Sequence, residues 1–194
     1  RIATTADDGW LGLEQLANGP CAVLAAVQAR LVAAQLARPG PTQDPCEADP
    51  LSLLVDALAG CLEDAAVAAG SGAAGPPHPL CRLVLPCPRG VVTIAAAGAA
   101  LRAALRWHVA VFTKPGGLVA LLHSLVATRG VKRVRQELKE AGEPSLVAGD
   151  SDAAGIGQVG FCTESLLTLC TSGAADGALD PSPTPKRQPT VGVV

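Results

Sequence analysis

The chain has 194 residues, a formal net charge of −2 and an aromatic content of only 2%, although 49% of its residues are apolar. That length suits one ordinary domain, and the near balance of 15 basic with 17 acidic residues, with almost no aromatic rings to stack on bases, argues against nucleic acid as a partner. No apolar run approaches the roughly 20 residues that a membrane-spanning helix needs, so we expect no membrane segment.

Most of the chain has the periodicity of amphipathic helices. Apolar residues recur every three to four positions within each segment, and Gly and Pro separate the segments. One segment starts with Asp49 as an N-cap, followed by Pro50 at the first helical position. In chain order, we expect helices over 22–37, 51–69, 99–111, 118–128, 131–140 and 163–170.

Two short aliphatic runs interrupt the helices. The runs 81–85 and 91–95, separated by Pro86-Cys-Pro-Arg-Gly90, predict two strands or a hairpin. Near the end of the chain, three Pro residues within 181–185 predict a flexible insertion over about 172–189. The expected fold class is therefore α+β or α/β, helix-rich, in a single domain over 1–194.

The composition also bears on the core and on the ends of the chain. Ala accounts for 36 residues, so the core has to consist of closely packed aliphatic side chains that each bury little area. The sequence begins at Arg1, contains no Met and ends in the strand-like Val191-Gly-Val-Val194. We therefore expect it to be a fragment of a longer protein.

The cysteines give no sign of a metal site or of a disulfide framework. Their number is odd, their spacing is irregular, and no C-x-x-C pair or His at ligand spacing accompanies them, so no metal or cofactor is expected. Reduced thiols suit a cytoplasmic or nuclear protein. The seven are Cys21, Cys46, Cys61, Cys81, Cys87, Cys162 and Cys170.

One cysteine, Cys21, occupies an unusual position. Asn18 can cap a helix and Pro20 suits its first position, so Cys21 falls in the first turn of the helix that follows. The positive end of the helix macrodipole and the unpaired N–H groups there favour the thiolate, which is a nucleophile. A cysteine at such a place is also often a small buried hydrophobe, so position alone leaves both interpretations open.

Acyl transfer also requires donors for the oxyanion that forms when a thiolate attacks a carbonyl. Gln15 lies six residues before Cys21, and its amide NH2, together with the backbone N–H of Cys21, could serve as these donors. Papain-like cysteine peptidases use that arrangement. The sequence therefore identifies Cys21 and Gln15 as candidate catalytic residues.

A general base is harder to find. His78 lies between prolines in a loop, His108 lies near a helix end, and His123 lies inside the apolar segment 118–128, where burial would disfavour its charged form. We expect each of the three to be structural.

The segment 13–29 closely resembles the nucleophile segment of the MINDY family of deubiquitinases, which carries a Gln, then Gly-Pro-Cys, then a helix ending in Val-Gln-Ala. Here these are Gln15, Gly19-Pro20-Cys21 and Val27-Gln28-Ala29. Two later segments agree in order. Residues 117–135 resemble the family's buried helix and the Val-x-x-Val-Arg that follows it, and 159–173 look like its Gly-x-x-(Ser/Thr)-(Gln/Glu)-x-Leu element.

The resemblance implies a papain-like thiol hydrolase that cuts isopeptide bonds in polyubiquitin and prefers the lysine linkage that marks proteins for the proteasome. Cys21 matches the nucleophile and Gln15 the oxyanion residue. Gln28 also matches a family residue, for which a surface or packing role is favoured. The family's general base is a His in a Ser-x-His-Phe-like strand well downstream, and no His follows Gly173 here. This sequence by itself is therefore expected to hydrolyse little or nothing.

Two alternatives remain open. The chain could be a non-catalytic ubiquitin-binding or scaffolding module, a degenerate relative in which Cys21 is a core residue. It could also be an Ala-rich helical domain that matches the motifs by coincidence. A Ser-x-His-Phe-like strand encoded beyond Val194 would favour the enzyme over the binding module. No motif indicates the oligomeric state.

Overall fold

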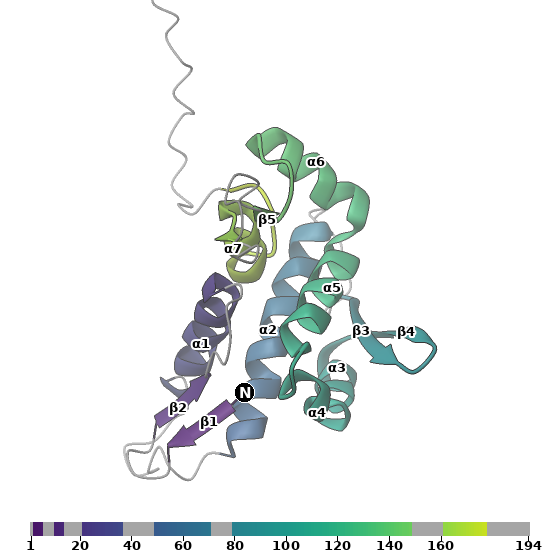
Figure 1. Cartoon of the computed structure of the whole chain (residues 1–194). Helices are drawn as coiled ribbons and strands as arrows, with labels where there is room; N and C mark the ends of the chain where they lie inside the picture. Colours follow the sequence, from purple (N-terminus) through teal and green to yellow (C-terminus); the bar gives the residue numbers. More distant parts are fainter. Residues whose placement is uncertain are drawn as a thin grey trace, which may run out of the picture.

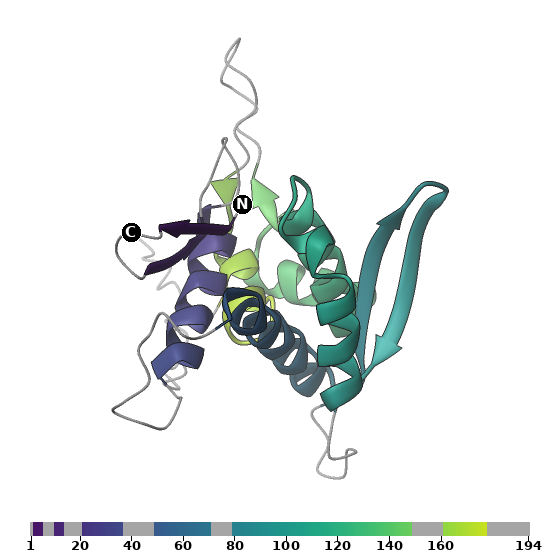
Figure 2. The same cartoon turned by 90° about the horizontal axis from the view of Figure 1, so that it is seen from below.

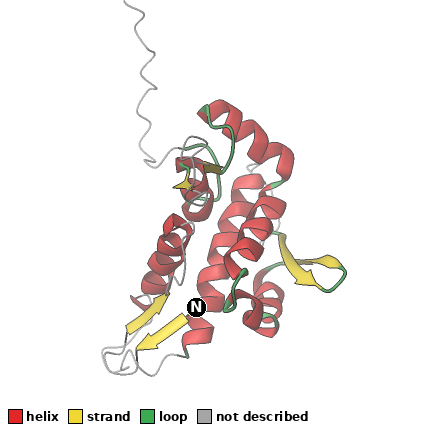
Figure 3. Cartoon of the chain, in the orientation of Figure 1, coloured by secondary structure: helices red, strands yellow, loops and turns green. Residues whose placement is uncertain are grey.

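The computed structural model describes residues 2–5, 10–13, 21–36, 49–70, 79–148 and 161–177. Within these ranges helices predominate, and the strands form three separate two-stranded sheets, each antiparallel (Figures 1 and 3). Isolated antiparallel pairs beside packed helices are typical of the α+β class, and the described part of the chain has no parallel pair of the α/β kind.

All the predicted helices and both strands of the predicted hairpin have counterparts in the same order, and the structure adds the short strands β1, β2, β5 and β6. Their bounds are β1 Ile2–Thr5, β2 Trp10–Leu13, α1 Cys21–Leu36, α2 Pro50–Ala69, β3 Cys81–Cys87, β4 Gly90–Ala96, α3 Gly98–Trp107, α4 Val109–Phe112, α5 Gly117–Arg129, α6 Val131–Ala141, β5 Val147–Ala148, β6 Phe161–Cys162 and α7 Glu164–Thr171.

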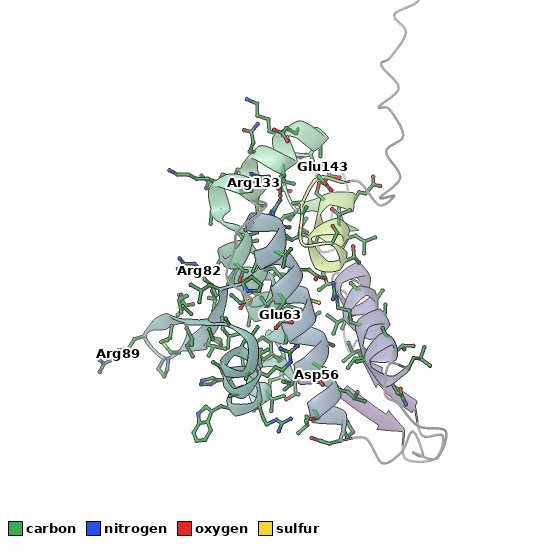
Figure 4. All side chains as sticks on the ribbon, turned by 180° about the vertical axis from the view of Figure 1, so that it is seen from behind. Asp56, Glu63, Arg82, Arg89, Arg133 and Glu143 are labelled. Carbon is green, nitrogen blue, oxygen red and sulfur yellow. The ribbon has the colours of Figure 1, made fainter. Side chains whose placement is uncertain are left out.

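Helix α2 lies at the centre of the molecule. It packs against α1 and α7 on one side and against α5 and α3 on the other (Figures 1 and 2). The carboxylate of Asp49 accepts hydrogen bonds from the N–H groups of Leu51 and Ser52, both at 3.2 Å, and Pro50 occupies the first turn, as predicted. Asp56 and Glu63 lie along one side of the helix (Figure 4), where both pair with Arg102 of α3.

The core is aliphatic, as the composition predicts, and its largest side chains are mostly leucines. Side chains from α1, α2, β3, α3, α5 and α7 meet in one cluster around α2. The largest completely buried side chains are Leu31, Leu53, Leu62, Leu83, Leu101, Leu105, Leu121, Leu125, Leu166, Leu169, Val23 and Val27.

The predicted hairpin is confirmed and is longer than expected. β3 pairs with β4 from Cys81 opposite Ala96 to Cys87 opposite Gly90, and α5 lies between this hairpin and α2 (Figure 2). β3 includes Pro86, which the sequence analysis placed in the turn. The nitrogen of Pro86 faces away from β4, so its missing N–H removes no hydrogen bond between the two strands.

Two helical predictions need correction. The segment expected as one helix over 99–111 is divided at His108 into α3 and α4. His123, which we expected to be buried, is exposed. The buried face of α5 includes Leu121 and Ser124, and position 123 lies about 200° around the helix from position 121, so it faces solvent.

The first residues of the expected flexible insertion over about 172–189 are instead part of the packed structure. Residues 172–177 pack against the core: Gly173 is buried, Ala175 is 0% exposed, and residues 178–189 lie outside the described part of the chain. Gly173 has φ +79°, and a Cβ atom there would collide with the backbone of Asp64 and Ala65. The close approach of this segment to α2 therefore requires glycine at position 173.

A buried ion pair joins α5, α6 and the segment after α7. The side chains of Arg129 and Glu137 are 4% and 7% exposed and form a salt bridge. Glu137 also accepts from the N–H of Ala175 at 2.9 Å and from Arg133 at 3.2 Å. Burial alone would raise the pKa of Glu137, but the hydrogen bonds from Arg129 and Ala175 outweigh it and hold that pKa below its ordinary value.

Glu137→Gln is expected to lower the free energy of unfolding by about 3–5 kcal/mol at neutral pH, because it leaves the Arg129 charge buried without its partner. The pKa of Glu137 is lower in the folded than in the unfolded state. Its contribution is therefore complete above the unfolded pKa and is lost as pH falls through the folded pKa. Urea unfolding at stepwise lower pH measures both effects.

The matched control is Glu140→Gln, an exposed position on the same helix, which should change stability by less than about 0.5 kcal/mol. Equal losses for the two variants would contradict the role assigned to Glu137. So would a wild-type protein that loses no more stability in acid than the Glu137→Gln variant.

Candidate functional site

Helix α1 begins at Cys21, so this residue lies in the first turn of a 16-residue helix, as the sequence predicts. The side chain of Cys21 is outside what the structure describes, and so are Gln15, Asn18 and Pro20. At the candidate site, the structure therefore describes the helix that carries Cys21 and the elements that pack against this helix.

The buried face of α1 is formed by Val23, Ala26, Val27 and Leu31, each at most 4% exposed. With 100° between successive helical residues, the backbone at position 21 lies about 200° from position 23. Position 21 is therefore on the side of α1 opposite to its packed face.

Gln28 lies on the same stripe of the helix as position 21, because seven residues are close to two complete turns. The Oε1 atom of Gln28 accepts a hydrogen bond of 2.9 Å from the N–H of Leu13, the last residue of β2. This bond attaches the end of β2 to the stripe that carries Cys21, about 10 Å along the helix axis. Gln15 follows Leu13 by two residues in the sequence.

The packing role expected for Gln28 thus takes a specific form, a side-chain bond to the backbone of the preceding strand. A Val-Gln-Ala sequence within a helix does not indicate this bond. The only signal available from the sequence was the match of Gln28 to the family motif.

Arg30 fixes α1 to its neighbours. Its guanidinium forms a salt bridge with Asp64 of α2 and donates a hydrogen bond of 2.8 Å to the backbone carbonyl of Thr171 at the end of α7. The three helices are thereby joined at one point, and Arg30 is half-buried between them. No local pattern in the sequence indicates this role of Arg30, because its partners are 34 and 141 residues away.

Three other cysteines have environments that oppose reactivity. Cys61, Cys81 and Cys170 are at most 1% exposed. Burial raises the pKa of Cys61 and of Cys81 to about 11 and that of Cys170 to about 12. These thiols are protonated at neutral pH, and a protonated thiol is a poor nucleophile.

The described histidines lie away from α1. His108 is at the junction of α3 and α4, and His123 is on α5, both on the other side of α2 from α1 (Figure 2). His78 is outside the described residues. The structure therefore brings neither His108 nor His123 to the start of α1.

In the part of the chain that the structure describes, no group of three or more His, Cys, Asp or Glu residues could hold a metal ion. None of the described helices combines the length and the apolar character needed to cross a membrane.

No protein-family model, curated protein or solved structure matches this chain significantly. The resemblance to MINDY deubiquitinases therefore depends on the three motifs themselves and on where they lie. The first contains the start of α1, the second coincides with α5 and the start of α6, and the third contains β6 and α7.

Alkylation of the folded protein by iodoacetamide at mildly alkaline pH should modify Cys61 and Cys81 about 100-fold more slowly than after unfolding, and Cys170 more slowly still. The reduced thiolate fraction alone accounts for this factor. Mass spectrometry of peptides gives the rate at each cysteine, with the half-buried Cys87 as the internal control. Modification of Cys61 or Cys170 in the folded state at the unfolded rate would contradict their assigned burial.

Gln28→Ala should accelerate amide hydrogen exchange at Leu13 and lower the free energy of unfolding by about 0.5–1.5 kcal/mol, because the Leu13 N–H loses its acceptor. Gln28→Glu retains an oxygen at the same place and should preserve the slow exchange. Nuclear magnetic resonance of the Leu13 amide measures the rate, and equal exchange in both variants would show that the bond does not hold β2.

Proposed function

We propose that this chain is the nucleophile-bearing part of a MINDY-like, papain-type deubiquitinase that hydrolyses isopeptide bonds in polyubiquitin. Cys21 is the nucleophile, and Gln15 with the backbone N–H of Cys21 stabilises the oxyanion. The observation that carries this proposal is that a long, well-anchored helix begins at the cysteine of the Gly-Pro-Cys motif.

The start of α1 favours a thiolate for electrostatic reasons. The helix macrodipole places roughly half a positive charge at its N-terminus, where the first backbone N–H groups lack helical partners. An acidic side chain in the first turn would offset this effect, and the first turn of α1 contains none. Position 21 is thus suited to a thiolate, whereas burial raises the pKa values of Cys61, Cys81 and Cys170 and keeps these thiols protonated.

The mutual packing of the three motifs also supports the proposal. α1 packs against α7, and α1, α5 and α7 all pack against α2, so segments separated by about a hundred residues belong to one core. The family resemblance requires the three segments to belong to one domain, and their packing meets this requirement.

In the proposed reaction, the thiolate of Cys21 attacks the isopeptide carbonyl, and the oxyanion forms hydrogen bonds with Gln15 and the Cys21 N–H. The carbon–nitrogen bond then breaks, the lysine amine leaves with a proton, and water hydrolyses the resulting thioester. Loss of the amine requires a general acid. The family's His would supply that proton, and its counterpart is expected beyond this sequence.

The non-catalytic alternative predicts ubiquitin binding without acylation of Cys21. A ubiquitin derivative with an electrophile at its C-terminus distinguishes the two functions even in a chain without the His. Its reaction forms a bond to the sulfur and does not depend on protonating a leaving amine.

Incubation with that ubiquitin derivative is expected to give a covalent adduct at Cys21, which Cys21→Ser abolishes. Gln15→Ala should slow adduct formation by about 100-fold if the amide stabilises developing charge. Cys162→Ser, at a half-buried position, is the matched control and should react like the wild type. Intact mass and peptide mapping identify the modified residue.

Equal labelling of Cys21, Cys61 and Cys170 would show that the derivative reacts with any accessible thiol, and this result would contradict the proposal. Tight binding of ubiquitin without any adduct would favour the non-catalytic module. If the ubiquitin derivative neither binds to the chain nor labels it, the coincidental match remains as the explanation of the motifs.

A further inference from the structure

The two edges of the β3–β4 hairpin differ. On the β3 edge, the N–H of Arg82 donates to Oγ1 of Thr128 at 2.8 Å, and the Thr128 hydroxyl donates to the carbonyl of Arg82 at 3.2 Å. The N–H of Val84 donates to Oγ of Ser124 at 2.8 Å. Hydroxyl groups on α5 therefore take the place of a neighbouring strand, and this edge is closed.

These bonds also establish which backbone groups of β4 face outward. Because Arg82 and Val84 turn their N–H and C=O groups toward α5, the alternating residues of β3 bond to β4. Through the register, the groups of Val91, Thr93 and Ala95 point away from β3. No residue within the described ranges donates to them or accepts from them, and all three residues are exposed.

β4 lacks the usual protection of an edge strand. Its sequence, Gly90-Val-Val-Thr-Ile-Ala-Ala96, contains no charged residue and no proline. The hairpin's charged residues are Arg82 on β3 and Arg89 in the turn (Figure 4). Val91 and Val92 are 63% and 48% exposed, and β4 is the outermost strand, farthest from the helices (Figure 2).

We propose that β4 is a self-association edge, which pairs antiparallel with β4 of a second copy about a two-fold axis at Thr93. In that register Thr93 faces Thr93 of the second copy, and Val91 faces its Ala95. Each of these pairs exchanges two backbone hydrogen bonds. The result is a four-stranded sheet in the order β3-β4-β4-β3, in which all the outward groups of Val91, Thr93 and Ala95 are bonded.

A second copy fits this edge because the edge is complementary to itself. The three outward residues are symmetric about Thr93, so one two-fold axis satisfies them all. The intervening Val92 lies opposite Ile94 of the second copy, which covers an exposed valine with an aliphatic side chain. Since β4 carries no charge, no like-charge repulsion opposes the pairing. This inference does not depend on the proposed catalytic role of Cys21.

The test is the mass of the intact chain in solution, measured by size-exclusion chromatography with light scattering over a range of concentrations. The wild type should approach the mass of two chains as concentration rises. Thr93→Lys and Thr93→Glu should each raise the dimer dissociation constant by about tenfold or more, because each places like charges opposite one another. An equimolar mixture of the two variants should recover the two-chain mass, since Lys and Glu then face each other across the axis.

Ala103→Lys, at an exposed position on α3, is the control for added charge and should dimerise like the wild type. Circular dichroism of each variant checks that the fold is retained. A wild type that remains a single chain at all concentrations would overturn the proposal. A dimer unaffected by either change at Thr93, or a mixture that fails to recover the dimer, would show that association uses another surface. The wild type could also be monomeric while the double variant Val191→Lys, Val193→Lys forms the dimer. That result would mean that the end of the chain itself occupies the edge, and it too would overturn the proposal.

Discussion

The close packing of α2 by four other helices is the constraint on which the rest of the structure depends. Half of the ten buried residues of α2 are alanine or cysteine, which allow the neighbouring backbones to come near. The most demanding contact is that of Gly173, where the chain after α7 touches the backbone of Asp64 and Ala65. Because aromatic residues are scarce, the core gains its stability from many small contacts, and each of these requires close fit.

This constraint connects the central helix with the candidate site. Asp64, whose backbone Gly173 touches, also pairs through its carboxylate with Arg30, and Arg30 bonds to the end of α7 as well. α1 is thus held near its middle by charge and along one face by Val23, Val27 and Leu31. The opposite stripe, with Cys21 at its start and Gln28 two turns later, is where β2 is attached. The direction of α1 therefore follows from contacts on the face away from position 21 and from Arg30 and Gln28 farther along the helix.

The sequence predicts the features that depend on local chemistry. Asp49-Pro50 begins α2 because the cap and the proline act within one turn, and the aliphatic runs around Pro88 and Arg89 pair because they are adjacent in the chain. The sequence also places Cys21 at a helix start.

Features that depend on distant partners were missed or predicted wrongly. The hydrophobic pattern of α5 is uniform around the helix, so it could not show that position 123 faces solvent while Leu121 and Leu125 are buried. Strands of two to four residues, such as β5 and β1, have too few alternating positions for a recognisable pattern. The Glu137 bond to Ala175 spans 38 residues, and nothing near either residue indicates it. The pairing of Cys21 with Gln15 stays a prediction, because Gln15 and the side chain of Cys21 lie outside the described residues.

The fold repeatedly uses side-chain oxygens to satisfy backbone groups at the ends and edges of its elements. Asp49 does so at the start of α2, Thr163 accepts from the Leu166 N–H at the start of α7, and Ser124 with Thr128 does so along β3. Backbone groups without such partners lower the stability of the fold when they are buried, and when they are exposed they can form hydrogen bonds with another chain. Among the strand edges that the structure describes, that of β4 is long and apolar, and no described side chain bonds to it. On the other edge of the same hairpin, the hydroxyl groups of Ser124 and Thr128 bond to β3, so the difference between the two edges comes from the residues of α5.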